Sequence, residues 1–434
     1  MSSSRIRWLL ACVLATTLGQ ASAYPIDGYA ETGIARLEGY RISQLDKRGL
    51  NHLPSGALLK TEQIQLRLTE HPDFALPAPD PALTRKIVAL LGADARNYSV
   101  SVLDLSDPHQ PIYAEHNAEV QRNPGSVGKI IVALALFQAL ADLYPDDIAA
   151  RQRILKNTQV TADEFIHTDS HTVPFWLPED GSMPRRALRE GDTANLWSYL
   201  DWALSASSNA AASMVMKQLV LLHQFGKDYP PTLEQEQTYF RESTAKERSE
   251  LLLDSLLTPL MRNGLDKDAL RQGSFFTAQG KRRIAGTNST CTTRELLRYL
   301  LLLEQGKLVD RWSSLEIKRL LYMTQRRIRY ASSPALEDAA VYFKSGSLFR
   351  CKPEPGFVCK KYQGNVDNWM NSVAIVEAPA GAPRQFYMVA LTSNVLKKNS
   401  AVEHQTFATR LQALLRDWPR AGIQDGQSAA AGSK

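Results

Sequence analysis

The sequence is poor in cysteine, with four in 434 residues, and poor in long apolar runs. Beyond the N-terminal segment no stretch reads as long and apolar enough to cross a bilayer, so we predict no membrane span. Three catalytic and nucleotide-binding signatures are missing: G-x-S-x-G, H-E-x-x-H and the Walker loop. Charge of one sign is not concentrated either. The net charge of +6 arises from basic residues interleaved with acidic ones, which argues against nucleic acid as a partner.

The N-terminus has the features of a secretory signal. Arg5 and Arg7 precede an apolar stretch from Trp8 to Leu18, and Ala21-Ser22-Ala23 forms a small-x-small cleavage site. Leu9-Leu10-Ala11-Cys12 also resembles a lipoprotein cleavage box, but the apolar run before Cys12 is short. We therefore predict that residues 1–23 are removed and that the protein is exported, most simply to a bacterial periplasm.

The remaining cysteines are Cys291, Cys351 and Cys359. Cys351 and Cys359 flank KPEPGFV, a turn that contains proline and glycine. In an oxidising compartment such a pair is expected to form a disulfide, the alternative being two free thiols. Cys291 is then left unpaired, and we predict that it is buried.

The pattern of apolar residues divides the chain into an N-terminal extension (24–80), a main body (81–420) and a tail (421–434) that is expected to be disordered. Helical periodicity predominates at 130–325, and two further helices are predicted near the ends of the main body, at 83–91 and 402–415. Strand-like runs are found at 98–105, 111–114, 340–347, 372–377 and 385–392. The predicted fold is a mixed α/β (α+β) fold, with an antiparallel sheet flanked by terminal helices and an all-helical lobe. A cleft between the sheet and the lobe is the expected site.

The stretch PGSVGKI at 124–130 opens the most apolar of these helices. Ser126 is a natural helix cap. It also lies three residues before Lys129, on the same helix face. A lysine in a half-buried cleft loses its proton more readily and can then activate a serine hydroxyl. A second S-x-x-K, Ser243–Lys246, lies in the charged run RESTAKERSE and is predicted to be surface.

Two further motifs follow in the chain, Ser207-Ser208-Asn209 and Lys344-Ser345-Gly346. The order S-x-x-K, S-x-N, K-[ST]-G resembles that of the penicillin-recognising serine enzymes. The stretches 189–212 and 286–297 are also similar to parts of the class A β-lactamases, and the resemblance covers roughly residues 83–418. It implies a serine acyl hydrolase with its site between the sheet and the helical lobe.

The resemblance implies a role for each motif residue. Ser126 attacks an amide carbonyl, and Lys129 takes or relays its proton. The backbone N–H groups of Ser126 and Ser347 form the oxyanion hole. The implied catalytic residues are Ser126, Lys129, Ser207 and Lys344, and the implied substrate-binding residues are Asn209, Ser345, Gly346 and Ser347. No cofactor or metal is implied, and the expected partner is a small molecule or a peptidoglycan peptide.

The sequence departs from the family pattern in two ways. S-S-N and K-S-G replace the usual S-D-N and K-T-G but keep the hydroxyl groups. The glutamate of an E-x-x-L-N motif, which activates the deacylating water in class A enzymes, has no counterpart between Asn209 and Gly286. The acidic residues of that stretch are predicted to face solvent: Glu234, Glu236, Glu242, Glu247 and Glu250. Acylation is therefore expected, whereas rapid deacylation is not.

The segment between the first two motifs is longer than in ordinary class A enzymes and contains His167, Asp169 and His171. In an extended chain these three side chains face one way, which suits zinc. There is neither a fourth ligand nor a helical spacing, so we favour a role at the rim of the cleft.

Three functions remain open at this point. The first is hydrolysis of a β-lactam or a related carboxylate-bearing amide. The second is a D-alanyl-D-alanine peptidase that acts on cell-wall peptides. The third is a non-catalytic sensor or wall-binding module that keeps the cleft.

Overall fold

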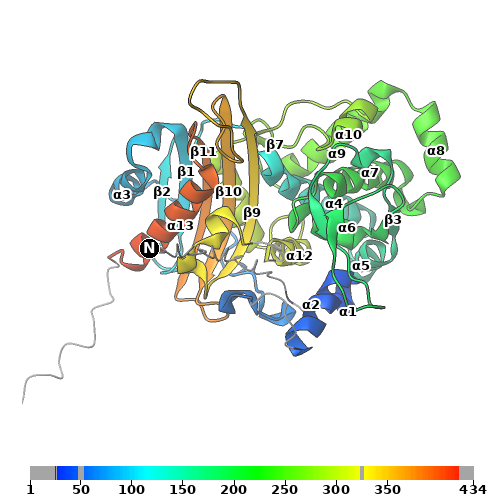
Figure 1. Ribbon diagram of the computed structural model, residues 1–434. Coiled ribbons are helices and arrows are strands. Elements are labelled where there is room, and N and C mark those ends of the chain that lie inside the picture. Colours follow the sequence, from blue (N-terminus) through cyan, green and yellow to red (C-terminus); the bar gives the residue numbers. More distant parts are fainter. Residues whose placement is uncertain (1–24, 26, 47–52, 323–326, 420–434) are drawn as a thin grey trace, which may run out of the picture.

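The computed structural model of the protein describes residues 25, 27–46, 53–322 and 327–419 (Figure 1). The predicted signal (1–23) and the predicted disordered tail (421–434) lie outside the described residues.

The sheet brings the two ends of the main body together (Figure 1). Its five strands run in the order β2-β1-β11-β10-β9, and every neighbouring pair is antiparallel. The early hairpin therefore joins the late meander through β1 and β11, where Val102 faces Val389. The strands are β1 (Tyr98–Asp104), β2 (Ile112–His116), β9 (Ala340–Arg350), β10 (Asp367–Ala378) and β11 (Gln385–Asn394).

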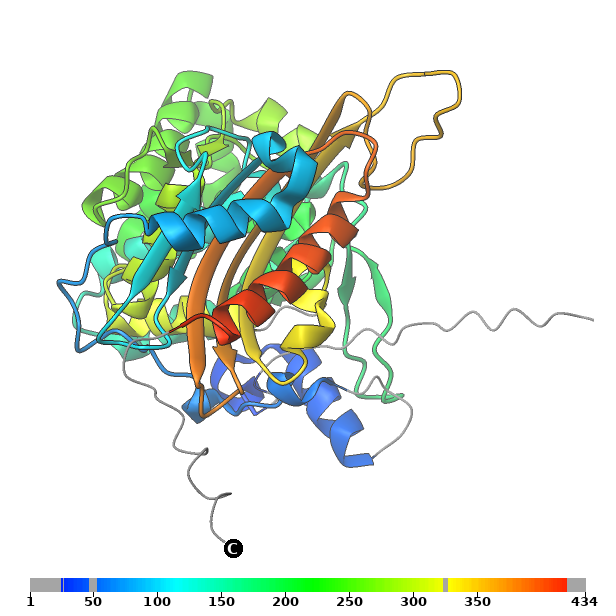
Figure 2. The ribbon, with the colours of Figure 1, turned by 90° about the vertical axis from the view of Figure 1, so that its left-hand side faces the viewer.

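Helices cover both faces of the sheet. The terminal helices α3 (Pro81–Leu91) and α13 (Ser400–Arg416) lie side by side on one face (Figure 2). Their apolar residues join one face of the strands in a core that includes Leu83, Ile87, Phe407 and Leu411. On the other face α11 (Thr293–Glu304) packs on β11, and α12 (Arg311–Tyr322) packs on β9. The predicted mixed α/β fold class with its antiparallel sheet is confirmed. The prediction that the lobe is all-helical is wrong, because the lobe contains short two-stranded sheets, in which β3 (Gln159–Thr161) pairs with β6 (Thr193–Asn195), β4 (Thr172–Pro174) with β5 (Arg185–Ala187), and β7 (Leu270–Arg271) with β8 (Thr290–Cys291).

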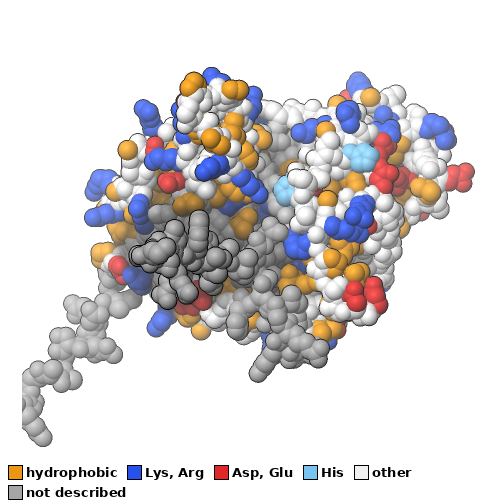
Figure 3. Space-filling view, in the orientation of Figure 1, with side chains coloured by type: hydrophobic (Ala, Val, Ile, Leu, Met, Phe, Trp, Pro, Cys, Tyr) orange, Lys and Arg blue, Asp and Glu red, His pale blue; other side chains and the backbone are white. Residues whose placement is uncertain are grey.

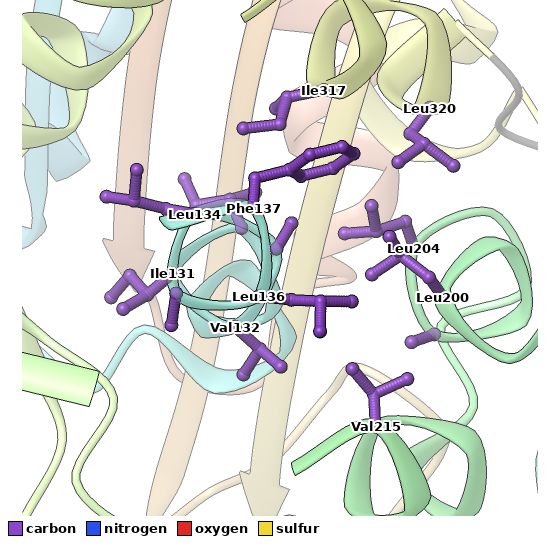
Figure 4. Close-up of a cluster of buried hydrophobic side chains, with 14 of the residues drawn as sticks. Ile131, Val132, Leu134, Leu136, Phe137, Leu200, Leu204, Val215, Ile317 and Leu320 are labelled. Carbon is purple, nitrogen blue, oxygen red and sulfur yellow. The ribbon is translucent and has the colours of Figure 1, made fainter. Parts of the chain in front are cut away.

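The helical lobe is built around α4 (Lys129–Leu143). Every residue from Lys129 to Ala141 is buried, and side chains of α6, α7 and α12 surround the helix (Figure 4). Gly125–Leu143 is in fact long and apolar enough to cross a membrane, contrary to our expectation, but 78% of its most apolar window is buried inside the fold. It is the core helix of the lobe. The other helices are α5 (Ile148–Asn157), α6 (Leu196–Leu204), α7 (Asn209–Phe225), α8 (Leu233–Glu242), α9 (Ala245–Arg262) and α10 (Ala278–Arg283).

Two α-helices, α1 (Tyr29–Thr32) and α2 (Ala35–Asp46), lie in the described part of the N-terminal extension. Arg36 of α2 donates two hydrogen bonds of 2.6 Å to Asp201 of α6, and both side chains are almost fully buried. This ion pair fixes the extension to the helical lobe.

Further along, the extension is fixed to the sheet. Arg67 pairs with Glu377 of β10 at 2.8 Å. Lys318 of α12 lies 2.7 Å from the same carboxylate and 2.5 Å from that of Glu304, and it donates to the carbonyl of Gln65. Because Lys318, Glu304 and Glu377 have no exposed side-chain surface, they form a buried network that the extension completes.

The disulfide prediction is confirmed. Cys351 and Cys359 are bonded, with their Cα atoms 6.1 Å apart, and they close a loop between β9 and β10. Cys291 is free and buried, as expected, and burial raises the pKa of its thiol to about 12.

His404 joins α13 to the sheet. Its ring nitrogens lie 3.0 Å from Ser372 Oγ of β10 and 2.9 Å from Ser393 Oγ of β11. Complete burial, together with the positive charge of Arg329, lowers the pKa of the imidazole to about 3. His404 is therefore neutral in the folded protein at pH values at which an unfolded histidine is protonated.

This burial predicts a pH-dependent stability. Below about pH 6.5 the unfolded chain binds a proton at His404 that the folded chain does not, so the free energy of unfolding falls by roughly 1.4 kcal/mol per pH unit toward pH 3. In His404→Gln this contribution is absent, and the loss of stability between pH 7 and pH 5 is expected to be about 2 kcal/mol smaller. Urea unfolding at both pH values measures the difference. The exposed His109 gives the control His109→Gln, and equal pH dependence in wild type and His404→Gln would contradict the prediction.

Candidate active site

Ser126 and Lys129 meet at the start of α4. Ser126 lies in a 3₁₀ turn, Gly125–Gly128, and Lys129 is the first residue of the helix. The prediction that Ser126 caps the helix is wrong, because Gly128 occupies the cap position and no side chain caps this end. Instead the Ser126 hydroxyl accepts a hydrogen bond of 2.8 Å from Lys129 Nζ. The hydroxyl therefore contacts the amine rather than the backbone.

Lys129 is buried, with 1% of its surface exposed. Its other hydrogen bonds go to the Ser207 carbonyl at 2.9 Å and to Asn209 Oδ1 at 2.7 Å. Burial lowers the pKa of the amine to about 7; the charge of Arg329 adds to this shift and Asp169 opposes it. A large fraction of Lys129 is thus neutral near pH 7 and able to take the proton of Ser126.

The S-S-N motif forms the turn between α6 and α7. Ser207 has a left-handed backbone with φ of 59°. Ser208 caps α7 through a hydrogen bond from the Ala211 N–H, and its hydroxyl donates to Asp169 at 2.9 Å. Asp169 also accepts from the Ala210 N–H, so the inserted segment supplies a carboxylate at the helix end where the usual S-D-N carries its aspartate.

The K-S-G motif lies on β9, the edge strand that faces the turn of Ser126. Lys344 is buried and donates hydrogen bonds of 2.8 Å to Ser207 Oγ and to the Ser345 carbonyl. Burial holds the pKa of Lys344 well below its usual range, and the charges of Lys129 and Arg329 add to the effect. The site thus contains two pairs of a hydroxyl with a buried amine, Ser126–Lys129 and Ser207–Lys344.

Gly346 allows β9 to approach the turn. A Cβ atom at this position would lie 2.5 Å from the Pro124 carbonyl oxygen and 2.6 Å from the Ser126 nitrogen, distances that only glycine avoids. The N–H groups of Ser126 and Ser347 are therefore brought to the same part of the site. That these two N–H groups form an oxyanion hole remains a prediction.

Arg329 is a residue of the site that sequence reasoning missed. It donates to Ser345 Oγ at 2.8 Å, to Ser347 Oγ at 2.9 Å and to Tyr362 Oη at 3.1 Å. It reaches them from a 3₁₀ turn, Arg329–Ser332, with a left-handed φ of 56°. No motif or spacing marks this arginine in the sequence RRIRY, so no sequence signal pointed to it. Its guanidinium is the group that best suits a substrate carboxylate, because it offers a planar fork of donors.

A cavity of about 380 Å³ joins these elements. Seven of the eight predicted site residues line it, and Lys129 lies against them, bonded to Ser126. Three of the lining residues are basic, Arg329, Lys344 and Lys361, and none of the lining residues is acidic. Lysine and arginine side chains also gather on both sides of the hollow between the sheet and the lobe (Figure 3). This cavity favours an anionic ligand.

The inserted segment is not extended, so the three groups considered for zinc do not face one way. Thr168 has a φ of 78°, and the turn there separates His167 from its neighbours. His167 pairs with Glu190 at 2.6 Å, whereas His171 pairs with Asp169 at 2.6 Å and lines the cavity. Within the described residues no cluster of three or more histidine, cysteine or acidic side chains is placed to hold a metal. A position at the rim, as predicted, is what the structure shows for His171.

No carboxylate hydrogen-bonds or pairs with Lys129 in the part of the chain that the structure describes. The Phe276 ring lies beside the amine, with Nζ 4.6 Å from the ring centre. Four of the glutamates predicted to face solvent are exposed: Glu234, Glu242, Glu247 and Glu250. The prediction is wrong for Glu236, which forms an ion pair with Lys217 of α7 and is 21% exposed.

The comparisons with known proteins agree with this description. The profile of the Beta-lactamase enzyme family matches residues 82–412. The protein is thus a serine hydrolase of the β-lactamase-like class. The chain belongs to the Beta-lactamase enzyme family, the match covering well over half of its length.

Solved structures are similar at low identity. A mutant of PBP-A, described as an acyl-enzyme complex with penicillin G, is 14% identical with a TM-score of 0.49, over 79% of this chain and 99% of that one. A β-lactamase from Sphaerobacter thermophilus DSM 20745 is 15% identical with a TM-score of 0.48, over 77% and 96%. A β-lactamase from Xanthomonas campestris pv. campestris str. ATCC 33913 is 15% identical with a TM-score of 0.47, over 77% and 98%. No curated protein matches the chain.

Proposed function

We propose that the protein is an exported serine hydrolase that forms an acyl-enzyme at Ser126 with a β-lactam or a related carboxylate-bearing amide. The observation that carries the proposal is the pair of hydroxyl–amine contacts, Ser126–Lys129 and Ser207–Lys344, each 2.8 Å long and each with a buried lysine. Two such pairs in one cavity provide a nucleophile with its base and a route for a proton to the leaving group.

The proposed acylation passes a proton in a relay from Ser126 to the leaving nitrogen. Ser126 Oγ bonds to the carbonyl carbon while Lys129 takes its proton, and the oxyanion is held by the N–H groups of Ser126 and Ser347. The C–N bond then breaks, and Ser207 Oγ gives its proton to the leaving nitrogen. Ser207 regains a proton from Lys129, either directly or through Lys344, so that both lysines return to their starting state. Arg329 and Ser345 hold the substrate carboxylate.

A fluorescent penicillin and a chromogenic cephalosporin, followed by intact mass, test the proposal. We expect an adduct on the wild type and none on Ser126→Ala. The control is Ser243→Ala, which removes the serine of the second S-x-x-K sequence. This half-buried residue at the end of α8 does not line the cavity, so the adduct should be unchanged. Folded wild-type protein that forms no adduct would refute acylation at Ser126.

The second candidate is a D-alanyl-D-alanine peptidase, favoured by the surroundings of Lys129. Among the described residues no carboxylate hydrogen-bonds to this amine, and the Phe276 ring lies beside it, so the glutamate that activates water in class A enzymes has no counterpart bonded to Lys129. We expect the penicillin adduct to persist after excess drug is removed, and D-alanine to be released from a peptide that ends in D-alanyl-D-alanine.

The outcomes separate the three functions. Rapid decay of the adduct with colour release from the cephalosporin would identify a β-lactamase and contradict the expected persistence. A persistent adduct with no turnover of any peptide would indicate a sensor. A wall-binding module would bind peptidoglycan fragments equally well as Ser126→Ala. The periplasmic location is tested by cell fractionation, with a mature N-terminus at Tyr24 as the expected result.

A further inference from the structure

An aspartate–histidine pair lies in the wall of the cavity and takes no part in the acylation described above. His171 Nδ1 lies 2.6 Å from Asp169 Oδ1. Asp169 is 3% exposed, and its other oxygen accepts hydrogen bonds from Ser208 Oγ at 2.9 Å and the Ala210 N–H at 2.8 Å. The carboxylate is thus held by the start of α7 and in turn holds the imidazole.

The pairing sets the tautomer of His171. Burial by itself would raise the pKa of Asp169, yet the hydrogen bonds from His171 and Ala210 hold it at about 2, so the carboxylate is ionised and can only accept. In the neutral imidazole the Nδ1–H is then the donor, which leaves the lone pair on Nε2. A carboxylate that orients an imidazole in this way is the arrangement by which a histidine is set up as a general base.

His171 is also the lining residue best suited to this role. The ring lines the same cavity as Ser126 and Ser207, and its side chain is 42% exposed, so it is accessible to water. The other titratable lining groups are engaged or cationic: Lys344 bonds Ser207, Arg329 bonds Ser345 and Ser347, Tyr362 accepts from Arg329, and Lys361 carries a positive charge. None of the lining residues is acidic.

Hydrolysis of an acyl-enzyme requires a base for water, and among the described residues no carboxylate hydrogen-bonds to Lys129. We propose that His171, oriented by Asp169, is the general base of deacylation. Nε2 takes a proton from water while the water oxygen bonds to the acyl carbon. The bond from that carbon to Ser126 Oγ then breaks, and Oγ regains the proton from His171. The proposal rests on the acyl-enzyme at Ser126 put forward above.

The test separates acylation from deacylation in His171→Gln. The probe is a thioester with a carboxylate on its leaving thiol, because thiol release reports acylation in the first turnover and deacylation in the steady state. We expect the first turnover at the wild-type rate, a steady state slower by about 10²–10⁴-fold, and an acyl adduct on Ser126 that accumulates in the intact mass. Added imidazole is expected to restore part of the steady-state rate in His171→Ala.

His167→Gln is the matched control. It makes the same change four residues earlier, in a histidine that pairs with Glu190 and does not line the cavity, so both phases should keep their wild-type rates. An unchanged steady state in His171→Gln would overturn the proposal. An equal fall in the rates of the first turnover and the steady state, with no rescue by imidazole, would also overturn the proposal. His171 would then serve only to shape the rim of the cavity. Wild-type protein that never forms the adduct would instead refute acylation itself.

Discussion

Lys129→Met is expected to slow acylation of Ser126 by about 10²–10⁴-fold, the contribution typical of a general base. Methionine has a similar length and suits the buried position, where the lysine has 1% of its surface exposed. The fold should therefore persist while the base is lost. Stopped-flow binding of a fluorescent penicillin gives the rate of acylation.

The pH dependence shows whether Lys129 acts as the neutral amine. Because its pKa is lowered to about 7, the fraction of free amine rises from pH 6 to pH 8, and the wild-type rate should rise with it and then level off. In Lys129→Met the acylation rate should no longer rise between pH 6 and pH 8.

Lys246→Met is the control for this change. It alters the lysine of the second S-x-x-K sequence, whose side chain is 83% exposed, and should leave both rate and profile unchanged. If Lys129→Met is acylated at the wild-type rate, another group accepts the proton of Ser126.

Arg36→Ala is expected to lower the free energy of unfolding by about 3–5 kcal/mol, because it leaves the buried Asp201 carboxylate without its partner. The pair joins the extension to α6 through two hydrogen bonds of 2.6 Å. Urea unfolding of the full mature chain, followed by circular dichroism, measures the change.

Arg41→Ala is the matched control for the ion pair. Arg41 lies on the same helix and pairs with Glu38, but the two side chains are 42% and 25% exposed, so its loss should leave the free energy of unfolding close to that of the wild type. Equal effects of the two variants would mean that the extension contributes through helix α2 as a whole. If Arg36→Ala is as stable as the wild type, the Asp201 carboxylate must be solvated in the variant.

Much of the fold could be predicted from the sequence because its signals are local. The helical periodicity found at 130–325 depends on neighbours three and four residues apart, and within that range α11 forms at Thr293–Glu304. Helix α2 gives no such signal, because its sequence ARLEGYRISQLD is largely polar. It is held by a partner 165 residues away, and no pattern within the extension reveals that contact.

Some residues of the site could likewise be predicted from the sequence, and others could not. Ser126, Ser207 and Lys344 belong to short motifs whose spacing or order is visible in the chain. Arg329 reaches the cavity only because a left-handed turn directs it toward β9. The pairing of Glu236 with Lys217 depends on how α8 packs against α7, which the charge pattern of α8 does not specify.

The folding unit begins earlier in the chain than the region that the family profile matches, because the folding unit includes the extension. The family match begins at residue 82, yet Arg36 and Arg67 lie before it and neutralise Asp201 and Glu377, which lie within it. A relative without the extension would bury these carboxylates with fewer positive charges beside them. A carboxylate at position 201 therefore depends on the presence of Arg36, which lies 165 positions earlier in the chain. Relatives that lack the extension are expected to carry an uncharged residue at the position of Asp201, whatever substrate they cleave.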